Sequence, residues 1–327
     1  MKCLLIAFVG LAACQYATAL TAKDPPYGQL SVKGVQLVGK DGQPVQLRGM
    51  SLFWSQWMGQ FWTKDVVKAI ACQWNGNLIR AAMGVDQGGY LSNKQGELQK
   101  LKVVVEAAIE AGIYVIVDWH IHEAVPTKGE AIAFFKQIAQ EYGKYPHVIY
   151  EDWNEPLQVD WNSVIKPYHE EVVKAIRAVD PDNIIVLGTP DWSGASGVVK
   201  AAASPLTGEK NIMYTLHYYS GSHKDKERNE FKSVADKIPI FVTEFGISEA
   251  DGGSNQQIYT DEANKWFALL DEKKISYANW AIADKQEASS VLKPGTQPSQ
   301  VGQDANLSPA GKFMKDHLKT KNTGVKC

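Results

Sequence analysis

Eight short apolar segments rich in β-branched residues recur along this chain with helical stretches between them, and this repeat limits the fold more than any other feature. The segments cover residues 45–52, 78–83, 114–119, 148–153, 184–187, 212–216, 240–243 and 277–282. Continuous apolar strands are what a parallel sheet needs when helices cover both of its faces. Eight such repeats predict an α/β fold, a closed (β/α)8 TIM barrel. An open doubly wound sheet would need a glycine-rich phosphate turn, and the sequence has none.

Local signals mark the ends of two helices. Ser92 and Gln95 form a predicted capping box, and Gly112 is placed to end the same helix. Ser308 followed by Pro309 predicts the start of the last helix. These signals place helices between the strands, as the barrel requires.

A small hairpin is predicted before the first barrel strand. Residues 29–34 and 36–38, with the turn at 39–42, have its pattern, and we expect it to plug the N-terminal end of the barrel. We expect a single domain from residue 20 to residue 318, followed by a disordered tail over 319–327.

Composition excludes several classes of protein. The 327 residues are 45% hydrophobic and 21% charged, which suits one large globular domain. The net charge of -2 gives no basic footprint for neutralising phosphates, and the sequence has no long Lys/Arg stripe, so nucleic acid is not an expected partner. We expect the protein to act as a monomer.

The N-terminus has the pattern of a secretory signal. Lys2 precedes an apolar run too short to span a bilayer, and small residues follow at Ala17 to Ala19. An ordinary buried helix would show an amphipathic period or a cap. We therefore expect residues 1–19 to be a cleaved signal peptide and the protein to be secreted, without a membrane anchor.

Four cysteines are present, and two of them lie in the predicted signal. Cys72 and Cys327 remain after cleavage. The first and last helices of a closed barrel are neighbours, so a bridge between these two cysteines is geometrically open. A domain of this size needs no disulfide, however, and we expect a buried thiol at 72 and a free one at 327.

Two glutamates follow predicted strands, Glu155 in an Asn-Glu-Pro sequence and Glu244 in a Thr-Glu-Phe-Gly sequence. The active sites of (β/α)8 barrels form at the carboxyl ends of the strands. Two convergent carboxyls are the minimum for cleaving a glycosidic bond, one protonated for the leaving oxygen and one ionised to attack or stabilise the sugar cation. An isolated Asn-Glu-Pro is common, so the strand context carries this prediction.

Five motifs resemble those of glycoside hydrolase family 5, in the family's order. They are Leu-Arg-Gly-Met at 47–50, Ile-Arg-Ala-Ala-Met at 79–83, Val-Asp-Trp-His at 117–120, Asn-Glu-Pro at 154–156 and Thr-Glu-Phe-Gly at 243–246. The similarity runs from about residue 27 to 318 and is greatest to secreted bacterial-type β-1,4-endoglucanases. The resemblance implies hydrolysis of internal bonds in cellulose-type glucans by retaining double displacement, without cofactor or metal.

The resemblance also implies catalytic roles. Glu155 would be the general acid and base, which requires a raised pKa, and Glu244 the ionised nucleophile. Arg80 and Tyr219 would stabilise the charge of Glu244, so Arg80→Ala should damage catalysis before binding. Further residues implied at the cleavage subsite are Asn154, for the sugar 2-hydroxyl, with His120 and His217.

Extended glucans are gripped by aromatic platforms. The implied stacking residues are Trp57, Tyr90, Trp192 and Trp280, with Lys285 and Glu287 for hydrogen bonds to a distal sugar. The family also implies a cis peptide after Trp280. Three other tryptophans, Trp74, Trp153 and Trp266, are expected to pack in the core.

Two segments depart from the family pattern. The first loop carries Phe53 and Trp54 where many relatives have a histidine, and the fourth motif has Asp152 and Trp153 where smaller or apolar residues are usual. Mannan, xylan, xyloglucan or mixed-linkage glucan therefore stay open as alternative substrates. The chain shows no Pro/Ser/Thr-rich linker to a cellulose-binding module, so we expect soluble or amorphous glucan rather than crystalline fibre.

Two other classes of function compete with a glycosidase. His120 and His122 resemble the His-x-His pair of metal-dependent barrel hydrolases, but the fifth strand, which ends near Thr189, offers no further ligand, and His122 is expected in a loop. A barrel that only binds glycans normally lacks a catalytic carboxylate, whereas both are present here.

Overall fold

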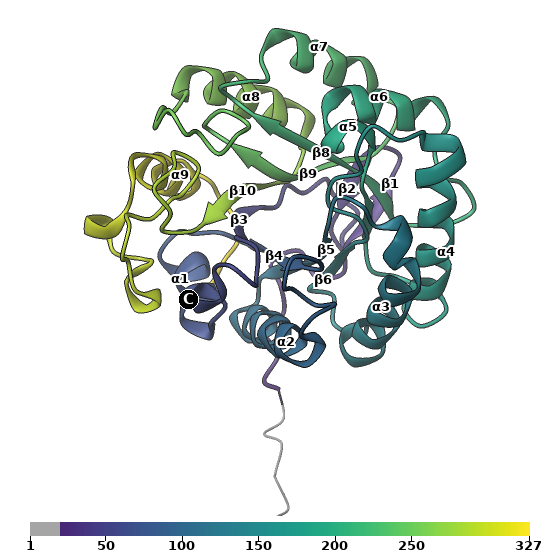
Figure 1. Cartoon of the computed structure of the whole chain (residues 1–327), viewed down its shortest axis with the longest axis horizontal. Helices are drawn as coiled ribbons and strands as arrows, with labels where there is room; N and C mark the ends of the chain where they lie inside the picture. The colour runs from purple at the N-terminus through teal and green to yellow at the C-terminus, as the bar shows by residue number, and fades with distance from the viewer. Residues whose placement is uncertain (1–19) are drawn as a thin grey trace, which may run out of the picture.

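Eight parallel strands close into a barrel in the computed structural model, which describes residues 20–327. The signal expected at 1–19 lies outside the described residues. Neighbouring strands follow the order β10-β3-β4-β5-β6-β7-β8-β9, with helices around them (Figure 1). The strands are β3 Arg48–Leu52, β4 Leu78–Gly84, β5 Tyr114–His120, β6 Val148–Glu151, β7 Ile185–Leu187, β8 Ile212–Tyr219, β9 Ile240–Gly246 and β10 Tyr277–Ile282. The predicted (β/α)8 TIM barrel is confirmed.

The strand limits differ from the predicted ones mainly where side chains are polar. Strands β8 and β9 continue beyond their apolar runs to Tyr219 and Gly246, so that His217 and Glu244 lie inside strands. Strand β6 instead ends early, at Glu151. An apolar run marks where a strand is buried, whereas the ends of these strands face the cleft and carry polar groups.

A ring of helices covers the outside of the barrel. The helices are α1 Lys64–Cys72, α2 Lys94–Ala111, α3 Lys128–Tyr142, α4 Lys166–Arg177, α6 Ala195–Ala203, α7 Asp225–Val234, α8 Thr260–Lys273 and α9 Pro309–Lys319. The short segment α5 Pro190–Ser193 follows β7 and is left-handed at residues 191–193. Shorter turns are η1 Gly59–Phe61, η2 Val125–Thr127, the π-helical η3 Trp161–Ile165, η4 Pro298–Gln300 and η5 Asp304–Asn306. No helix within residues 20–327 is both long enough and apolar enough to cross a membrane.

The main apolar core lies between the barrel and this ring. Trp74, Trp153 and Trp266 all belong to it and are at most 2% exposed. Their predicted core positions are confirmed.

Helix caps agree with the sequence signals except at one position. Helix α2 is capped by Asn93, whose side chain accepts from the backbone of Gly96, so the predicted cap at Ser92 was one residue early. Gly112 ends the same helix in the left-handed conformation, and the Ser308 side chain caps α9, both as predicted.

The hairpin β1 (Ser31–Lys33) and β2 (Gln36–Val38) closes the N-terminal end of the barrel. Leu30 and Leu37 pack in one buried cluster with the inward residues of the barrel strands, which confirms the plug. The hairpin turns at Gly34, which has a φ of 61°. The predicted turn at 39–42 instead follows the hairpin.

The C-terminal segment is fastened to the barrel. Cys72, at the end of α1, forms a disulfide with Cys327. The carbonyl of Thr323 accepts a hydrogen bond from Asn77, and its hydroxyl donates to Asn75. The expectations of two free thiols and of a disordered 319–327 tail were therefore wrong.

Removing this disulfide should lower the stability of the domain. The bridge spans 255 residues of sequence. A disulfide typically contributes about 2–4 kcal/mol by restricting the unfolded chain, and longer loops contribute more. We expect the Cys72→Ser, Cys327→Ser double variant to unfold at a lower urea concentration than the oxidised protein. Reductant should shift the parent protein toward the double variant and leave the variant unchanged. Equal midpoints for both oxidised proteins would contradict a stabilising bridge.

Candidate active site

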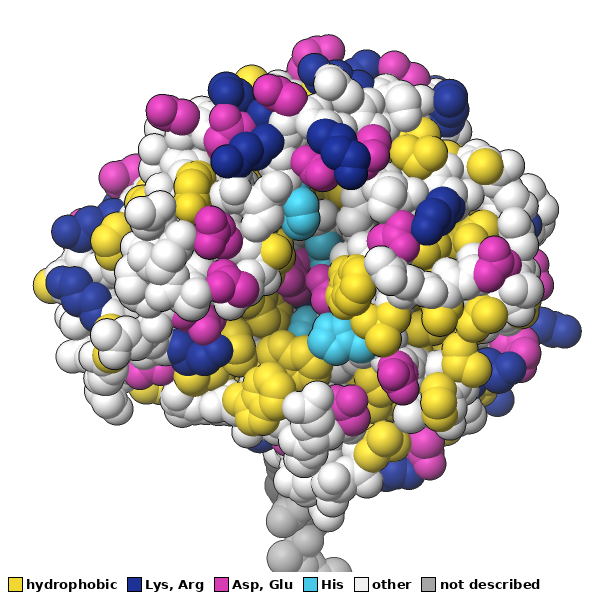
Figure 2. All heavy atoms as spheres, turned by 45° about the horizontal axis from the view of Figure 1, so that its top comes forward, with side chains coloured by type: hydrophobic (Ala, Val, Ile, Leu, Met, Phe, Trp, Pro, Cys, Tyr) yellow, Lys and Arg dark blue, Asp and Glu magenta, His cyan; other side chains and the backbone are white. Residues whose placement is uncertain are grey.

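A cleft opens at the carboxyl ends of the barrel strands. Figure 2 shows the hollow, with acidic and histidine side chains at its bottom and hydrophobic side chains along one rim. The predicted residues that line it are His120, Asn154, Glu155, Tyr219, Glu244, Trp280, Lys285 and Glu287. A second hollow adjoins it, lined among others by Trp192 and His217, and shares Glu155 and Tyr219 with the first. The structure thus brings most of the predicted residues to one place.

Glu244 is held by two donors. Arg80 Nη1 donates to its Oε2 at 2.8 Å, and the Tyr219 hydroxyl donates to its Oε1 at 2.5 Å. Burial and the charge of Glu244 raise the pKa of Tyr219 well above its usual value, so the phenol keeps its proton. Two donors, one on each oxygen, fix the orientation of the Glu244 carboxylate.

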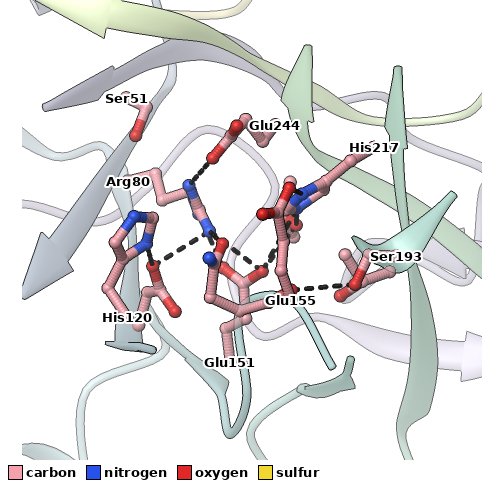
Figure 3. A network of polar contacts seen from close by, with 12 residues as sticks. Ser51, Arg80, His120, Glu151, Glu155, Ser193, His217 and Glu244 are labelled. Carbon is pink, nitrogen blue, oxygen red and sulfur yellow. Dashed lines mark hydrogen bonds and ion pairs between the residues drawn. The ribbon is translucent and has the colours of Figure 1, made fainter. Parts of the chain in front are cut away.

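Arg80 is the centre of a buried ionic network (Figure 3). Its guanidinium contacts Glu151 at 2.7 Å, Asp118 at 2.9 Å and Glu244 at 2.8 Å, and it also donates to Asn154 Oδ1 at 2.7 Å. Burial alone would lower the pKa of Arg80, but the three carboxylates raise it. One cation therefore aligns the nucleophile candidate with the amide next to the acid candidate.

Glu155 accepts from two histidines. His217 Nδ1 lies 2.9 Å from its Oε1, and His122 Nε2 lies 3.1 Å from its Oε2. Burial would raise the pKa of Glu155, but these two hydrogen bonds and charges lower it to about 2. The raised pKa expected for this residue is therefore wrong for the protein without substrate.

The hydrogen bonds around His217 show where the proton needed for acid catalysis lies when Glu155 is ionised. The Thr243 hydroxyl donates to Glu151 at 2.6 Å, so its oxygen must accept from His217 Nε2 at 2.9 Å. The other ring nitrogen faces Glu155, and the contact between them holds one transferable proton. Burial would lower the pKa of His217, but the charges of Glu244, Glu151 and Glu155 raise it to about 9. In the resting protein the proton therefore lies on the imidazole.

His120 also lines the cleft. Its Nδ1 lies 2.6 Å from Asp118 Oδ2, and its ring stacks on Trp280 with centroids 5.3 Å apart. Burial and the charge of Arg80 lower the pKa of His120 well below its usual value. A neutral ring whose Nδ1 donates to Asp118 leaves Nε2 as an acceptor for a substrate hydroxyl.

The metal alternative is not favoured by this arrangement. Strand β5 ends at His120, and His122 lies in the following loop, as expected. His120 bonds Asp118 while His122 bonds Glu155, so the two rings do not converge. Within residues 20–327, one atom each of Glu155, His217 and Glu244 could surround an ion, since these atoms lie within 4.8 Å of one another. This group consists of the two candidate carboxyls and the histidine that bonds Glu155, and it does not include the His120 and His122 pair.

The part of the cleft near Phe53, Trp54 and Lys285 is aromatic and charged. Lys285 bonds Glu287 at 2.6 Å and lies over the ring of Phe53, 4.6 Å from its centroid. Trp54 packs edge-on against His120, with ring centroids 4.1 Å apart, and also lines the cleft. The two first-loop residues that depart from the family pattern are thus cleft walls. The predicted cis peptide between Trp280 and Ala281 is present.

Two predicted platforms lie at the edges of the cleft. Trp57 is 47% exposed and packs on Trp54 without lining the cleft itself. Trp192 is 45% exposed in the second hollow. It lies in three consecutive left-handed residues, Asp191 to Ser193, with φ near 57°, 57° and 54°. Such residues cost roughly 1–2 kcal/mol each, so contacts with neighbouring segments must hold this turn.

Tyr90 is not a substrate platform. It is only 4% exposed, and its ring packs edge-on against Trp119 and Phe134. The loop after β4 turns back on itself through a hydrogen bond from the Tyr90 amide to the Gly84 carbonyl at 2.8 Å, which directs the ring into the core. The prediction for Tyr90 was wrong.

Sequence reasoning missed three supports of the site. Glu151 lies inside the predicted apolar segment 148–153, where an ionisable residue is itself a signal. Asp118 lies in the motif at 117–120, but the sequence analysis predicts no role for it. His122 was considered only as a metal ligand, whereas it bonds the acid candidate.

Comparisons with known proteins agree with this geometry. Residues 38–286 match the cellulase family, glycosyl hydrolase family 5. The chain is 43% identical over 301 residues to an endoglucanase of Clostridium saccharobutylicum and 41% identical over 320 residues to endoglucanase Z of Dickeya dadantii. These alignments cover 90% and 96% of this chain but only 66% and 71% of the relatives.

Solved structures extend the agreement to the whole barrel. The catalytic domain of Thermobifida fusca endoglucanase Cel5A superposes with a TM-score of 0.85 at 35% identity, covering 90% of this chain and 99% of that one. A variant of that domain, 34% identical to this chain and with the same TM-score and coverage, was solved in complex with cellotetraose. Because the family match includes both glutamates and most of the barrel, this chain belongs to the cellulases of glycosyl hydrolase family 5.

Proposed function

We propose that this protein is an endo-β-1,4-glucanase that hydrolyses internal bonds of cellulose-type glucans with retention of configuration. The observation that carries the proposal is the carboxyl pair, in which one oxygen of Glu155 lies within 4.8 Å of one oxygen of Glu244. Retaining glycosidases hold their carboxyls about 5–5.5 Å apart, whereas inverting ones need about 6.5–9.5 Å for an intervening water. The names of the relatives and the cellotetraose bound to Cel5A support the substrate class.

In the first step, Glu244 attacks the anomeric carbon while the glycosidic oxygen leaves with a proton. That proton comes from the contact between His217 and Glu155, and Glu155 delivers it because its carboxyl faces the cleft. Arg80 and Tyr219 keep the attacking carboxylate oriented. The bond from carbon to the leaving oxygen breaks as the bond to Glu244 forms.

In the second step, water replaces the leaving chain and Glu155 accepts its proton. The resulting hydroxide equivalent attacks the anomeric carbon from the face that the leaving group vacated. Glu244 departs as a carboxylate, and the proton returns to the pair of Glu155 and His217. Two inversions give net retention.

The arrangement of the two hollows supports internal cleavage. Glu155 and Tyr219 line both of them, so the reacting groups lie where the hollows meet. Trp280, Lys285 and Glu287 would bind sugars on one side, and Trp192 those on the other. A chain that crosses both hollows places an internal bond at the carboxyls.

Viscosity and reducing ends measured together test this function. On a soluble β-1,4-glucan we expect viscosity to fall quickly while few new reducing ends appear, because internal cuts shorten chains most. Mannan and xylan serve as parallel substrates. If reducing ends appear from mannan or xylan but not from glucan, the carboxyl pair keeps its role and the cleft has a different substrate. No hydrolysis of any of the three would contradict the enzymatic proposal.

Replacing His217 by alanine should move the alkaline limb of kcat/KM to lower pH. In the parent protein the pair of His217 and Glu155 keeps its proton until pH passes the His217 pKa of about 9. Acid catalysis is therefore present below that pH and lost above it. Without the imidazole, the proton must reside on Glu155 itself, and a carboxyl releases it at lower pH. Profiles on one soluble glucan measure the shift; an unmoved alkaline limb would contradict this assignment.

We also propose that the enzyme is secreted. The signal pattern over residues 1–19 supports this, as does the Cys72–Cys327 disulfide, because such bonds persist mainly in oxidising compartments. N-terminal sequencing of protein from a culture medium should begin near Leu20. A product that retains Met1 would contradict it.

A further inference from the structure

Asp152 and Trp153 directly precede Asn154 and Glu155, yet neither lines the cleft. Both are buried, at 0% and 2% exposure. The Asp152 carboxyl lies 2.8 Å from Nδ1 of His169, which is on helix α4. The two residues that depart from the family pattern in the fourth motif are therefore directed away from the substrate and into the packing behind the acid candidate.

His169 connects Asp152 to the next barrel strand. Its Nε2 lies 2.9 Å from the carbonyl of Gly188, which can only accept, so Nε2 carries a hydrogen. Nδ1 and the Asp152 carboxyl must then share one further proton to bond at 2.8 Å. Burial raises the pKa of Asp152, which favours retention of that proton. Two strong hydrogen bonds thus join the exits of β6 and β7 through one imidazole.

The segment after β7 contacts residues 152–154, which precede Glu155, at a second point. It runs from Gly188 through the left-handed turn to Ser193, whose hydroxyl donates to the carbonyl of Asn154 at 2.8 Å. The two segments are in close contact, since a Cβ on Gly188 would lie 2.1 Å from the Trp153 carbonyl. Residues 152–154 are therefore held by hydrogen bonds at both ends, from His169 to Asp152 and from Ser193 to Asn154.

Trp153 supports Glu155 indirectly, through the loop that carries His122. Its Nε1 donates to the carbonyl of His122 at 3.0 Å, and the His122 imidazole lies 3.1 Å from Glu155 Oε2. The indole also packs edge-on against Tyr168, with ring centroids 4.8 Å apart. Trp153 thus fixes the loop that carries one of the two histidines on Glu155.

We propose that Asp152, His169 and Trp153 are positioning residues for Glu155, which hold its turn and its histidine partner in place from behind the cleft. The inference rests on the proposed acid and base role of Glu155. A displacement of about 1 Å in a catalytic group can cost roughly a hundredfold in rate. Loss of this support should therefore appear as loss of acid catalysis as well as loss of stability.

Two substrates of different leaving-group ability separate these effects. Soluble β-1,4-glucan needs a proton on its leaving oxygen, whereas 2,4-dinitrophenyl β-cellobioside has a leaving group that departs without one. For this second substrate kcat/KM reports the first step, which depends on Glu244 and little on Glu155. In Asp152→Ala and His169→Ala we expect kcat/KM on glucan to fall by about ten- to hundredfold, and kcat/KM on the aryl glycoside to fall much less.

Conservative variants sharpen the test. Asp152→Asn can donate its amide to Nδ1 while Nε2 still donates to Gly188, so it should keep the parent ratio of the two activities. Trp153→Phe keeps an aromatic side chain and removes the indole N–H that donates to His122, at the cost of some packing volume. It should show a smaller selective loss on glucan, and it keeps the proposal testable if Asp152→Ala fails to fold. His317→Ala is the matched control, because His317 also bonds a buried partner, Tyr277 at 2.7 Å, but belongs to α9. It should lower stability without changing the ratio.

Glu155→Ala, measured in parallel, distinguishes the two proposals. Selective loss on glucan in Glu155→Ala, Asp152→Ala, His169→Ala and Trp153→Phe is the expected result. Selective loss in Glu155→Ala alone, with the other folded variants losing both activities equally or neither, would overturn the positioning role. Equal loss of both activities in Glu155→Ala would overturn the acid role and the positioning proposal with it.

Discussion

Glu244→Gln should lose glucan hydrolysis by about 10⁴-fold or more while it stays folded and binds glucan. The amide has the shape of the carboxylate and can still accept from Tyr219, which now donates to Oε1 at 2.5 Å. It cannot form the glycosyl ester, however, so the first step fails. The measurements are kcat on soluble glucan and calorimetric binding of a cello-oligosaccharide.

Glu287→Gln is the comparison variant. Glu287 also lines the cleft but bonds Lys285 at its edge, so its loss should raise KM more than it lowers kcat. Turnover by Glu244→Gln within tenfold of the parent would remove Glu244 from the nucleophile role. Loss of glucan binding together with turnover would show that the variant had altered the cleft rather than the chemistry.

Arg80→Ala should destabilise the fold as well as catalysis. The side chain is fully buried and contacts Asp118, Glu151 and Glu244. Removing the cation leaves three buried carboxyls without their counter-charge, and breaking a buried pair of this kind typically costs about 3–5 kcal/mol. Urea unfolding should report this loss, and kcat should fall in the residual folded protein because Glu244 loses one of its two donors.

Lys64→Ala is the control for Arg80. Lys64 pairs with Glu110 at 3.3 Å on the surface, with side chains 56% and 37% exposed, and such pairs contribute about 1 kcal/mol or less. An Arg80→Ala protein as stable as Lys64→Ala would contradict the buried network. The sequence alone led us to expect damage to catalysis before binding; the three carboxylates add the loss of stability.

The barrel could be predicted because its strands obey a local rule. Each contains a run of residues that is apolar on both faces, so that the segment 114–119, which is apolar except for Asp118, is recognisable without its neighbours. The disulfide could not be predicted in the same way, because it depends on where the residues after α9 lie relative to α1, 255 residues away in the sequence. The prediction for Tyr90 was wrong for a related reason. The direction of its ring depends on how the loop after β4 folds back, with a backbone hydrogen bond to Gly84, and the sequence does not show this.

The identity of the site residues could largely be predicted from the sequence, but their pKa values and protonation states could not. Strand ends place Glu155 and Glu244 at one face, and their motifs assign the roles. The pKa of Glu155 depends instead on His122 from a different loop and on His217 from another strand. The proton therefore lies on an imidazole, which the rule that burial raises a carboxyl pKa does not capture. The partnership of Asp152 with His169 likewise joins two elements that the sequence does not show as neighbours.

Trapping the glycosyl intermediate tests the central claim most directly. A 2-deoxy-2-fluoro-β-cellobiosyl fluoride slows both steps but hydrolysis more, so a double-displacement enzyme accumulates a covalent ester. The labelled protein can be digested and the modified residue located by mass spectrometry. We predict a single cellobiosyl label on Glu244 and none on Glu155; a label on Glu155, or no label on an enzyme that hydrolyses glucan, would contradict the mechanism.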